Sequence, residues 1–275
     1  METIRIEHDR ELPGLVTITL ARPGKLNVIN FRMHAEIQEA CRNLADDADA
    51  RVVIFTGEGR AFSAGADLGG STSDPNRPAL AAANAEPSPL RERIRSSAGN
   101  RTSAAIEGLD QVTIGAVNGL AIGGAVVFLS CMDIRLASES AWFSIPEVDL
   151  DIPLTWNALP RLMRELGPAR TKELVMSCDR FSSEDALRWG FLNHRVPDGE
   201  ALPRARTLAE KLLKKDPVSL ALTKTGSGIL QLGGANVNTG AIAITSGMLR
   251  MGNGQALGDG TAALEEPGRA ERRPG

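Results

Sequence analysis

Two short glycine-bearing segments constrain this chain more than any other feature of its sequence. Residues 62–68 read Phe-Ser-Ala-Gly-Ala-Asp-Leu, and residues 118–125 read Asn-Gly-Leu-Ala-Ile-Gly-Gly-Ala. Each follows an apolar run typical of a buried strand, at 51–56 and at 112–117. Either segment alone is more often an ordinary tight turn. Together they resemble an oxyanion hole, because glycine and alanine let a carbonyl oxygen come within hydrogen-bond distance of main-chain N–H groups.

Strands, small-residue turns and a helix alternate through the first half of the chain. Residues 4–7 and 15–20 have the pattern of strands, and a Pro-Gly pair between them predicts a hairpin. Apolar residues recur near helical spacing over residues 31–45, with Asn30 as the expected N-cap. A further strand is expected at 133–137. This alternation predicts an α/β architecture with crossover connections.

From residue 160 onward the pattern is mostly helical. Helices are predicted, with one short strand-like run at 192–196 between them, over residues 161–166, 168–177, 182–189, 199–215 and 217–230.

Two stretches lack apolar periodicity. Residues 69–86 are rich in Gly, Ser, Asp, Asn, Pro and Ala, which predicts a mobile loop. From residue 252 the chain becomes rich in Gly, Ala and charged residues, so we expect a disordered tail over residues 252–275.

Composition argues against several classes of protein. The 275-residue chain has a formal net charge of −3, so we expect no binding of nucleic acid and no attachment to an anionic membrane surface. Its three cysteines lack Cys-x-x-Cys spacing, which predicts reduced thiols, no disulfide and no zinc site. No apolar run has the length of a signal-peptide core or a membrane span, so a soluble, cytoplasmic protein is expected. His8, His34 and His194 do not cluster, which gives little support to a metal site or a Ser-His-Asp triad.

The two glycine-bearing segments, followed in step by Asp133 and by Ile145, Pro146 and Glu147, resemble the crotonase (enoyl-CoA hydratase/isomerase) superfamily. The likeness runs from about residue 4 to about residue 230. It implies an α/β fold of the crotonase type, which is a spiral of ββα units with a C-terminal helical region that forms trimers. The expected domains are a spiral core at 1–198, a helical region at 199–251 and the tail at 252–275, assembled as a homotrimer or homohexamer.

The resemblance also implies an enzyme that acts on an acyl-CoA thioester. Negative charge then develops on the thioester oxygen, and by family position the backbone N–H groups of Ala66 and Gly124 hold it. Glu147 is the implied acid/base, and its apolar neighbours are expected to raise its pKa. No cofactor or metal is expected, because coenzyme A is part of the substrate.

One position departs from the family's hydratases. These carry two glutamates that hold and activate water, but the first of the two positions is Val127 here and only Glu147 remains. A single carboxylate can still carry a proton between two carbons of one substrate. The pattern therefore favours isomerisation of 3-enoyl-CoA to 2-enoyl-CoA. Hydration of 2-enoyl-CoA and non-catalytic acyl-CoA binding are the alternatives, while Thr155 disfavours the dienoyl-CoA isomerases, which have an Asp at that position.

Several further residues are candidates for substrate contact. Lys25 lies in an Arg-Pro-x-x-x-Asn loop that matches the family's loop beside the nucleotide, and it is a candidate for contact with phosphate. Asp149 and Asp151 are nearby carboxylates that could act in place of Glu147, although Asp151 is expected to modify the pocket instead. Trp156 and Trp189 are expected in packing or in the acyl tunnel. The other predicted substrate-binding residues are Ala64, Asp67, Leu68, Gly123, Val127 and Trp142.

Overall fold

The computed structural model of the chain describes two compact units, Met1–Lys214 and Lys215–Gly275. The residues described are 1–68, 90, 93 and 96–224, followed by the strand segments 229–232, 242–244, 248–251, 262–264 and 269–271. The loop predicted at 69–86 lies outside the described residues. In the described part of the chain no helix is both long and apolar enough to cross a membrane.

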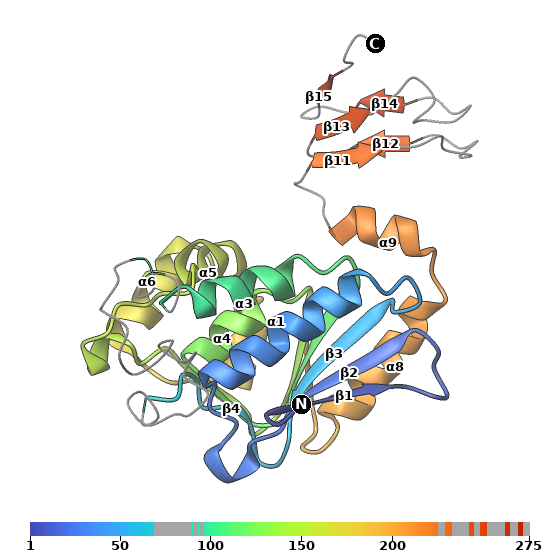
Figure 1. Cartoon of the computed structure of the whole chain (residues 1–275). Helices are drawn as coiled ribbons and strands as arrows, with labels where there is room; N and C mark the ends of the chain where they lie inside the picture. The colour runs from blue at the N-terminus through green and yellow to red at the C-terminus, as the bar shows by residue number, and fades with distance from the viewer. Residues whose placement is uncertain are drawn as a thin grey trace. The chain divides into compact units, whose positions relative to one another are not determined.

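A large sheet forms the centre of the first unit (Figure 1). It has six strands in the order β1-β2-β3-β5-β7-β10, of which β1 and β2 are antiparallel and the others parallel. The strands predicted from apolar runs all lie in this sheet. They are β1 (Ile4–His8), β2 (Leu15–Leu20), β3 (Val52–Gly57), β5 (Val112–Val117), β7 (Ile134–Ser138) and β10 (His194–Val196).

A second, smaller sheet has the order β4-β6-β8-β9. Its strands are β4 (Ala61–Ser63), β6 (Leu120–Ile122), β8 (Trp142–Ser144) and β9 (Phe181–Ser182). Each of β4, β6 and β8 follows a strand of the large sheet, and a helix comes next, so a ββα unit recurs along the chain. This confirms the predicted α/β architecture. The short strands escaped sequence prediction because three residues are too few to show an alternating pattern.

Helices cover both faces of the large sheet. The helices of the first unit are α1 (Phe31–Ala45), α3 (Ala98–Glu107), α4 (Gly124–Ser130), α5 (Ala158–Leu166), α6 (Pro168–Ser177), α7 (Ser183–Arg188) and α8 (Ala201–Leu213), with 3-10 turns η1 (Pro23–Lys25) and η2 (Val148–Leu150). The predicted cap of α1 is confirmed, since Asn30 Oδ1 accepts a hydrogen bond of 2.9 Å from the amide of Met33.

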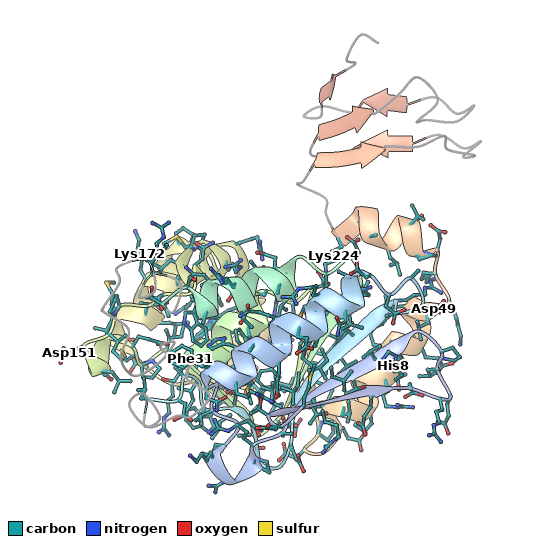
Figure 2. The ribbon with its side chains drawn as sticks, viewed as in Figure 1. His8, Phe31, Asp49, Asp151, Lys172 and Lys224 are labelled. Carbon is teal, nitrogen blue, oxygen red and sulfur yellow. The ribbon has the colours of Figure 1, made fainter. Side chains whose placement is uncertain are left out.

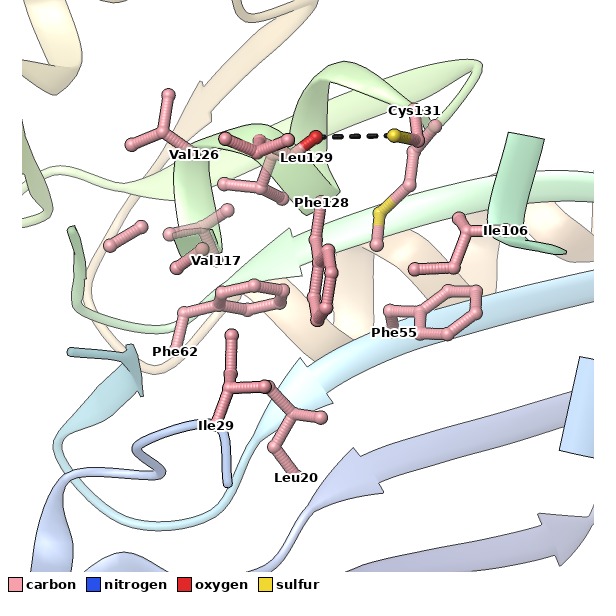
Figure 3. Close-up of a cluster of buried hydrophobic side chains, with 14 of the residues drawn as sticks. Leu20, Ile29, Phe55, Phe62, Ile106, Val117, Val126, Phe128, Leu129 and Cys131 are labelled. Atoms are coloured by element: carbon pink, nitrogen blue, oxygen red, sulfur yellow. Dashed lines mark hydrogen bonds between the residues drawn. The ribbon is translucent and has the colours of Figure 1, made fainter. Parts of the chain in front are cut away.

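Side chains of strand β3 alternate between the two apolar cores, one on each face of the large sheet. Val53 and Phe55 of β3 pack in a cluster with α1, α3 and α4, where Figure 3 shows the rings of Phe55, Phe62 and Phe128 close together. Val52 and Ile54 pack on the other face against the alanines of α8. A strand buried on both faces reads as a continuous apolar run, which is why β3 was predictable from sequence.

The second unit differs from its predicted structure. Helix α9 (Pro217–Lys224) ends six residues earlier than the helix predicted over 217–230, and β11 (Ile229–Leu232) follows. Gly226 and Gly228 explain the break, because glycine is a poor helix former. The predicted helical region at 199–251 also contains strands, and α8 belongs to the first unit. The remaining strands of this unit are β12 (Ile242–Ile244), β13 (Met248–Met251), β14 (Ala262–Leu264) and β15 (Arg269–Glu271).

Disorder was predicted over residues 252–275. Within this range the structure describes two short strands, of which β14 pairs with β12 and β15 pairs with β13, both in parallel. Main-chain pairing of this kind satisfies backbone groups without an apolar sequence pattern. The rest of that range lies outside the described residues.

Candidate active site

The small sheet brings three predicted segments to one edge. Strands β4, β6 and β8 are parallel neighbours, so their carboxyl ends lie together. Ala66 follows β4, Gly124 follows β6 and Glu147 follows β8 within a few residues. One cavity of about 550 Å³ of empty space, open to solvent, is lined by all three segments. Its lining residues include Ala64, Gly65, Ala66, Leu68, Ile122, Gly123, Gly124, Val127, Glu147 and Trp156.

The N–H group of Ala66 is left free by the way its segment pairs. Ile29 forms a parallel bridge with Ala66, in which the Ile29 amide donates to Gly65 O (2.7 Å) and the Asp67 amide donates to Ile29 O (3.0 Å). In a parallel bridge the backbone groups of the residue between these two bonds point the other way. Accordingly, no residue in the described part of the chain accepts a hydrogen bond from the Ala66 amide.

Within the described residues, the N–H group of Gly124 lacks an acceptor for a different reason. Gly124 is the first residue of α4, and the first amides of a helix have no partner within it. The preceding Gly123 has φ +52° and donates to Ser144 O at 2.8 Å, which ties the turn after β6 to β8. The two glycine-bearing segments also touch, since a Cβ added to Gly65 would lie 3.5 Å from Gly124 N.

The Glu147 carboxylate lies directly against the second glycine turn. A Cβ added to Gly123 would be only 2.6 Å from Glu147 Oε1, so a side chain there would displace the carboxylate, and the φ of +52° separately favours glycine. Glu147 Oε2 is buried, and no described group donates a hydrogen bond to it. Burial raises the pKa of Glu147 above that of an exposed glutamate. The side chain is therefore a carboxyl group set up to exchange a proton within the cavity.

Val127 lies one turn into α4 and is fully buried in the cavity wall. Glu147 is the only acidic residue among the described residues that line this cavity. Asp149 and Asp151 are exposed and do not line it, and Figure 2 shows Asp151 at the periphery of its unit. The expectation that Asp151 modifies the pocket is thus wrong, because the 3-10 turn after Glu147 directs it to solvent.

Trp156 forms a large part of the cavity wall. Its indole fills a slot between two helices, since a Cβ added to Gly99 or to Gly124 would come within 2.1 or 2.2 Å of it. The ring stacks on Phe128 with centroids 5.4 Å apart. Trp189, the other tryptophan predicted for packing or the acyl tunnel, packs elsewhere, with the Arg170 guanidinium 4.2 Å above its ring.

Three other predicted contact residues have different surroundings. Asp67 lines an adjoining cavity and accepts a hydrogen bond of 3.0 Å from Arg22. Lys25 is exposed on η1 and lines neither cavity. Trp142 does not line them either, and its ring is covered by the Arg180 guanidinium at 4.1 Å. Of the predicted substrate-binding residues, Ala64, Leu68, Gly123 and Val127 line the cavity that holds Glu147. Trp142 and Lys25 line neither cavity.

The Arg-Pro-x-x-x-Asn loop at residues 22–27 has a structural role in this geometry. Asn27 is fully buried, and its Nδ2 donates to Glu58 O and to Ala61 O, both at 2.9 Å. Its Oδ1 accepts from the Arg22 amide at 2.9 Å. The loop thus fixes the start of β4, and with it the segment that carries Ala66. In the described part of the chain no three His, Cys, Asp or Glu residues converge as metal ligands would.

The family model for enoyl-CoA hydratase/isomerase matches residues 10–227, which is most of the chain. The chain belongs to this family. It is 30% identical over 227 residues to a crotonyl-CoA hydratase of Syntrophomonas wolfei, covering 82% of this chain and 81% of that protein. It is 36% identical over 211 residues to a carnitinyl-CoA dehydratase of Salmonella enteritidis, covering 76% and 75%.

Solved structures agree with this assignment. An enoyl-CoA hydratase from Bacillus anthracis is 30% identical with a TM-score of 0.71, covering 82% of each chain. A monofunctional enoyl CoA isomerase from M. smegmatis is 26% identical with a TM-score of 0.66, covering 82% of this chain and 92% of that one. The fold is therefore that of the crotonase superfamily, and this family member is an enzyme, with both hydratases and an isomerase among its relatives.

Proposed function

We propose that this enzyme converts 3-enoyl-CoA to 2-enoyl-CoA, with Glu147 as its single acid/base. The observation that carries the proposal is the pairing of Glu147 with Val127 in one cavity wall. Positioning a water molecule for hydration needs a second polar group opposite the first carboxylate, and a valine side chain has neither a lone pair nor a proton to offer.

The proposed reaction uses the geometry as follows. The thioester oxygen accepts hydrogen bonds from the amides of Ala66 and Gly124, which line the cavity and have no acceptor among the described residues. Glu147 removes a proton from C2 of the 3-enoyl group, and the electron pair delocalises onto the thioester oxygen as a dienolate. The protonated Glu147 then returns the proton to C4, which leaves the double bond between C2 and C3. Loss of one such amide donor typically costs roughly 3–4 kcal/mol of activation free energy.

Hydration of a 2-enoyl-CoA is the second candidate. The names of the related proteins favour it more than the geometry of the cavity does. Two of the relatives are a hydratase and a dehydratase by name. Glu147 alone would then have to activate the water. Non-catalytic acyl-CoA binding is a third candidate, and the absence of turnover on a panel of thioesters would favour it.

A competition between two substrates tests the proposal. The enzyme is incubated with crotonyl-CoA and with trans-3-hexenoyl-CoA, and kcat/KM is measured for each. The proposal predicts a larger value for the shift of the 3-enoyl double bond. Faster loss of crotonyl-CoA to its hydrated product would instead assign the enzyme to the hydratases.

A further inference from the structure

A second cavity adjoins the one that holds Glu147. It extends to the first turn of α1 and the start of α3, and its wall includes His34 and Gly99. The two cavities share part of their walls, so the second lies directly beside the first, with Trp156 in both linings. The shared residues are Ala66, Leu68, Leu150, Ile152 and Trp156.

His34 is held firmly in the wall of this second cavity. It is buried, and its ring meets Trp156 edge to face with centroids 4.9 Å apart. A second aromatic contact, to Phe128, has centroids 6.0 Å apart. His34 Nδ1 lies 2.9 Å from Thr102 Oγ1 on α3. The imidazole therefore has one orientation, set from α3 on one side and by two aromatic rings on the other.

The surroundings of Thr102 determine which ring nitrogen of His34 carries the proton. The Thr102 hydroxyl oxygen lies 3.0 Å from Ala98 O and 3.5 Å from His34 O, and it accepts from Gln38 Nε2 at 2.8 Å. We assign its single proton to Ala98 O, the nearer carbonyl oxygen. With that proton on Ala98 O, Nδ1 of His34 is the donor to Thr102 and Nε2 keeps an unprotonated lone pair, which is the tautomer that we assign. In the described part of the chain no group donates to Nε2. Burial lowers the pKa of His34 to about 4, so the ring is neutral at physiological pH.

The other polar side chains of this cavity already have partners. Asn30 caps α1 through the Met33 amide, Asp67 is paired with Arg22, and Ser96 Oγ donates to Arg93 O at 3.0 Å. Most of the remaining wall is apolar. Among the described residues, His34 Nε2 is thus an acceptor without a donor, set in a wall that otherwise suits a hydrocarbon chain. A bound alkyl chain would leave this acceptor unpaired, whereas a hydroxyl group would satisfy it.

We propose that His34 Nε2 accepts a hydrogen bond from a hydroxyl group on the acyl part of the substrate. The enzyme would then prefer hydroxylated acyl-CoA thioesters over alkyl thioesters of the same length. This inference rests on the proposed function in that it places the acyl group in these two cavities. An amide N–H of the pantetheine arm could supply the same donor chemistry, and the experiment separates the two sources.

The test measures binding rather than turnover. Isothermal titration calorimetry with the full chain compares butanoyl-, hexanoyl- and octanoyl-CoA with their ω-hydroxy counterparts. One uncharged hydrogen bond predicts that the wild-type protein binds at least one hydroxylated ligand about three- to tenfold more tightly than its alkyl counterpart. His34→Leu should abolish this preference. His194→Leu, which changes an exposed histidine on β10, should leave it intact.

Two outcomes would overturn the inference. One is a wild-type protein with no preference for any hydroxylated ligand. The other is a His34→Leu variant that binds both ligands of each pair equally more weakly, because the donor would then be the pantetheine amide. Saturated thioesters have no double bond to shift. A protein that keeps the preference but does not isomerise 3-enoyl-CoA would therefore refute only the proposed function.

A spectroscopic measurement covers the case in which His34→Leu does not fold. ¹⁵N-histidine spectra of the wild-type protein near pH 7 should show His34 neutral with its proton on Nδ1. A proton on Nε2 would overturn the inference. Thr102→Val removes the acceptor for Nδ1–H while keeping the side chain's shape, so the preference for the hydroxylated ligand should fall with it.

Discussion

At the scale of single residues, Glu147 combines two demands that conflict. A general base must ionise, yet the same carboxylate is half-buried with Oε2 lacking a partner among the described residues. Burial raises its pKa, which brings the group closer to the pH at which it must both take and return a proton. Such conflicts between stability and chemistry are common at active sites.

Replacing this carboxyl group should affect activity and stability in opposite directions. Glu147→Gln is expected to lower kcat by about 10²- to 10⁴-fold, because no other acid lines the cavity in the described part of the chain. A group whose folded-state pKa is raised stabilises the fold below its unfolded pKa, and this contribution is lost as the pH rises through the folded pKa. The variant's thermal midpoint relative to wild type should therefore increase from pH 4 to pH 7.

The pH dependence of the wild-type enzyme supplies an independent check. Since the free enzyme needs ionised Glu147, kcat/KM should fall on the acid side with an apparent pKa above that of an ordinary glutamate. An acid limb at the usual glutamate value, or a Glu147→Gln variant that loses stability at neutral pH, would contradict this account of the side chain.

A substitution at Gly65 tests the contact between the two glycine-bearing segments. It has φ +84°, and an added Cβ would lie 2.6 Å from Ile122 O. Gly190 has a similar φ of +81° but nothing within 4 Å, so it is a control for backbone strain alone. Gly65→Ala should reduce the free energy of unfolding by about 1–3 kcal/mol more than Gly190→Ala, measured by urea denaturation. Equal losses would show that the close packing against β6 is absent.

At the scale of elements, the helices and strands that could be predicted from the sequence were the long ones with a regular apolar pattern. Helix α1 and strands β3 and β5 were predicted because each has six or more residues in an apolar pattern that indicates a buried element. The three-residue strands β4, β6 and β8 are too short to show such a pattern, although they position Ala66, Gly124 and Glu147. The wall residue Trp156 could be only loosely assigned, because its position depends on glycines in two distant helices. Val127 was identified through family position, and the role of Asn27 through the structure alone.

The anchoring of β1 to α1 gives a prediction at this scale. Glu36 accepts hydrogen bonds from the amides of Glu2 (2.8 Å) and Thr3 (2.9 Å) and from Arg32 Nε (2.7 Å). Burial alone would raise the pKa of Glu36, but these hydrogen bonds outweigh it and lower the pKa to about 2. Glu36→Gln should therefore cost about 1–3 kcal/mol of unfolding free energy at pH 7.

The pH dependence of that loss has a definite sign. A carboxylate with a depressed folded-state pKa stabilises the fold above its unfolded pKa, and this contribution disappears as the pH falls through the folded value of about 2. The difference between wild type and Glu36→Gln should therefore shrink as denaturation is measured from pH 5 downward. Glu39→Gln, on the exposed side of the same helix, should change stability by less than about 0.5 kcal/mol at every pH.

At the scale of the whole molecule, the described lining of the cavity lies entirely within the first unit. The described members of both apolar cores lie between Ile4 and Ala209, and the cavity residues lie between Ala64 and Trp156. Residues 1–214 alone should consequently unfold in one cooperative transition, with a midpoint within about 5 °C of the same transition in the full chain. Calorimetry on both chains would decide, and a truncated chain without a cooperative transition would contradict the prediction.

Assembly is a separate prediction at this scale. The likeness to the crotonase superfamily leads us to propose a homotrimer or homohexamer. Light scattering coupled to gel filtration should give three or six times the mass of the chain. A monomer at micromolar concentration would contradict the proposal without affecting the geometry of the cavity.

Proton transfer by Glu147 is the central claim, and one NMR experiment tests it most directly. The wild-type enzyme and Glu147→Gln are each incubated with trans-3-hexenoyl-CoA in D₂O, and the C2 protons and the vinyl signals are followed by ¹H NMR. We predict that the wild-type enzyme shifts the double bond to C2 and that the variant is slower by at least about 100-fold. Migration of the double bond at a similar rate in both proteins would contradict the account.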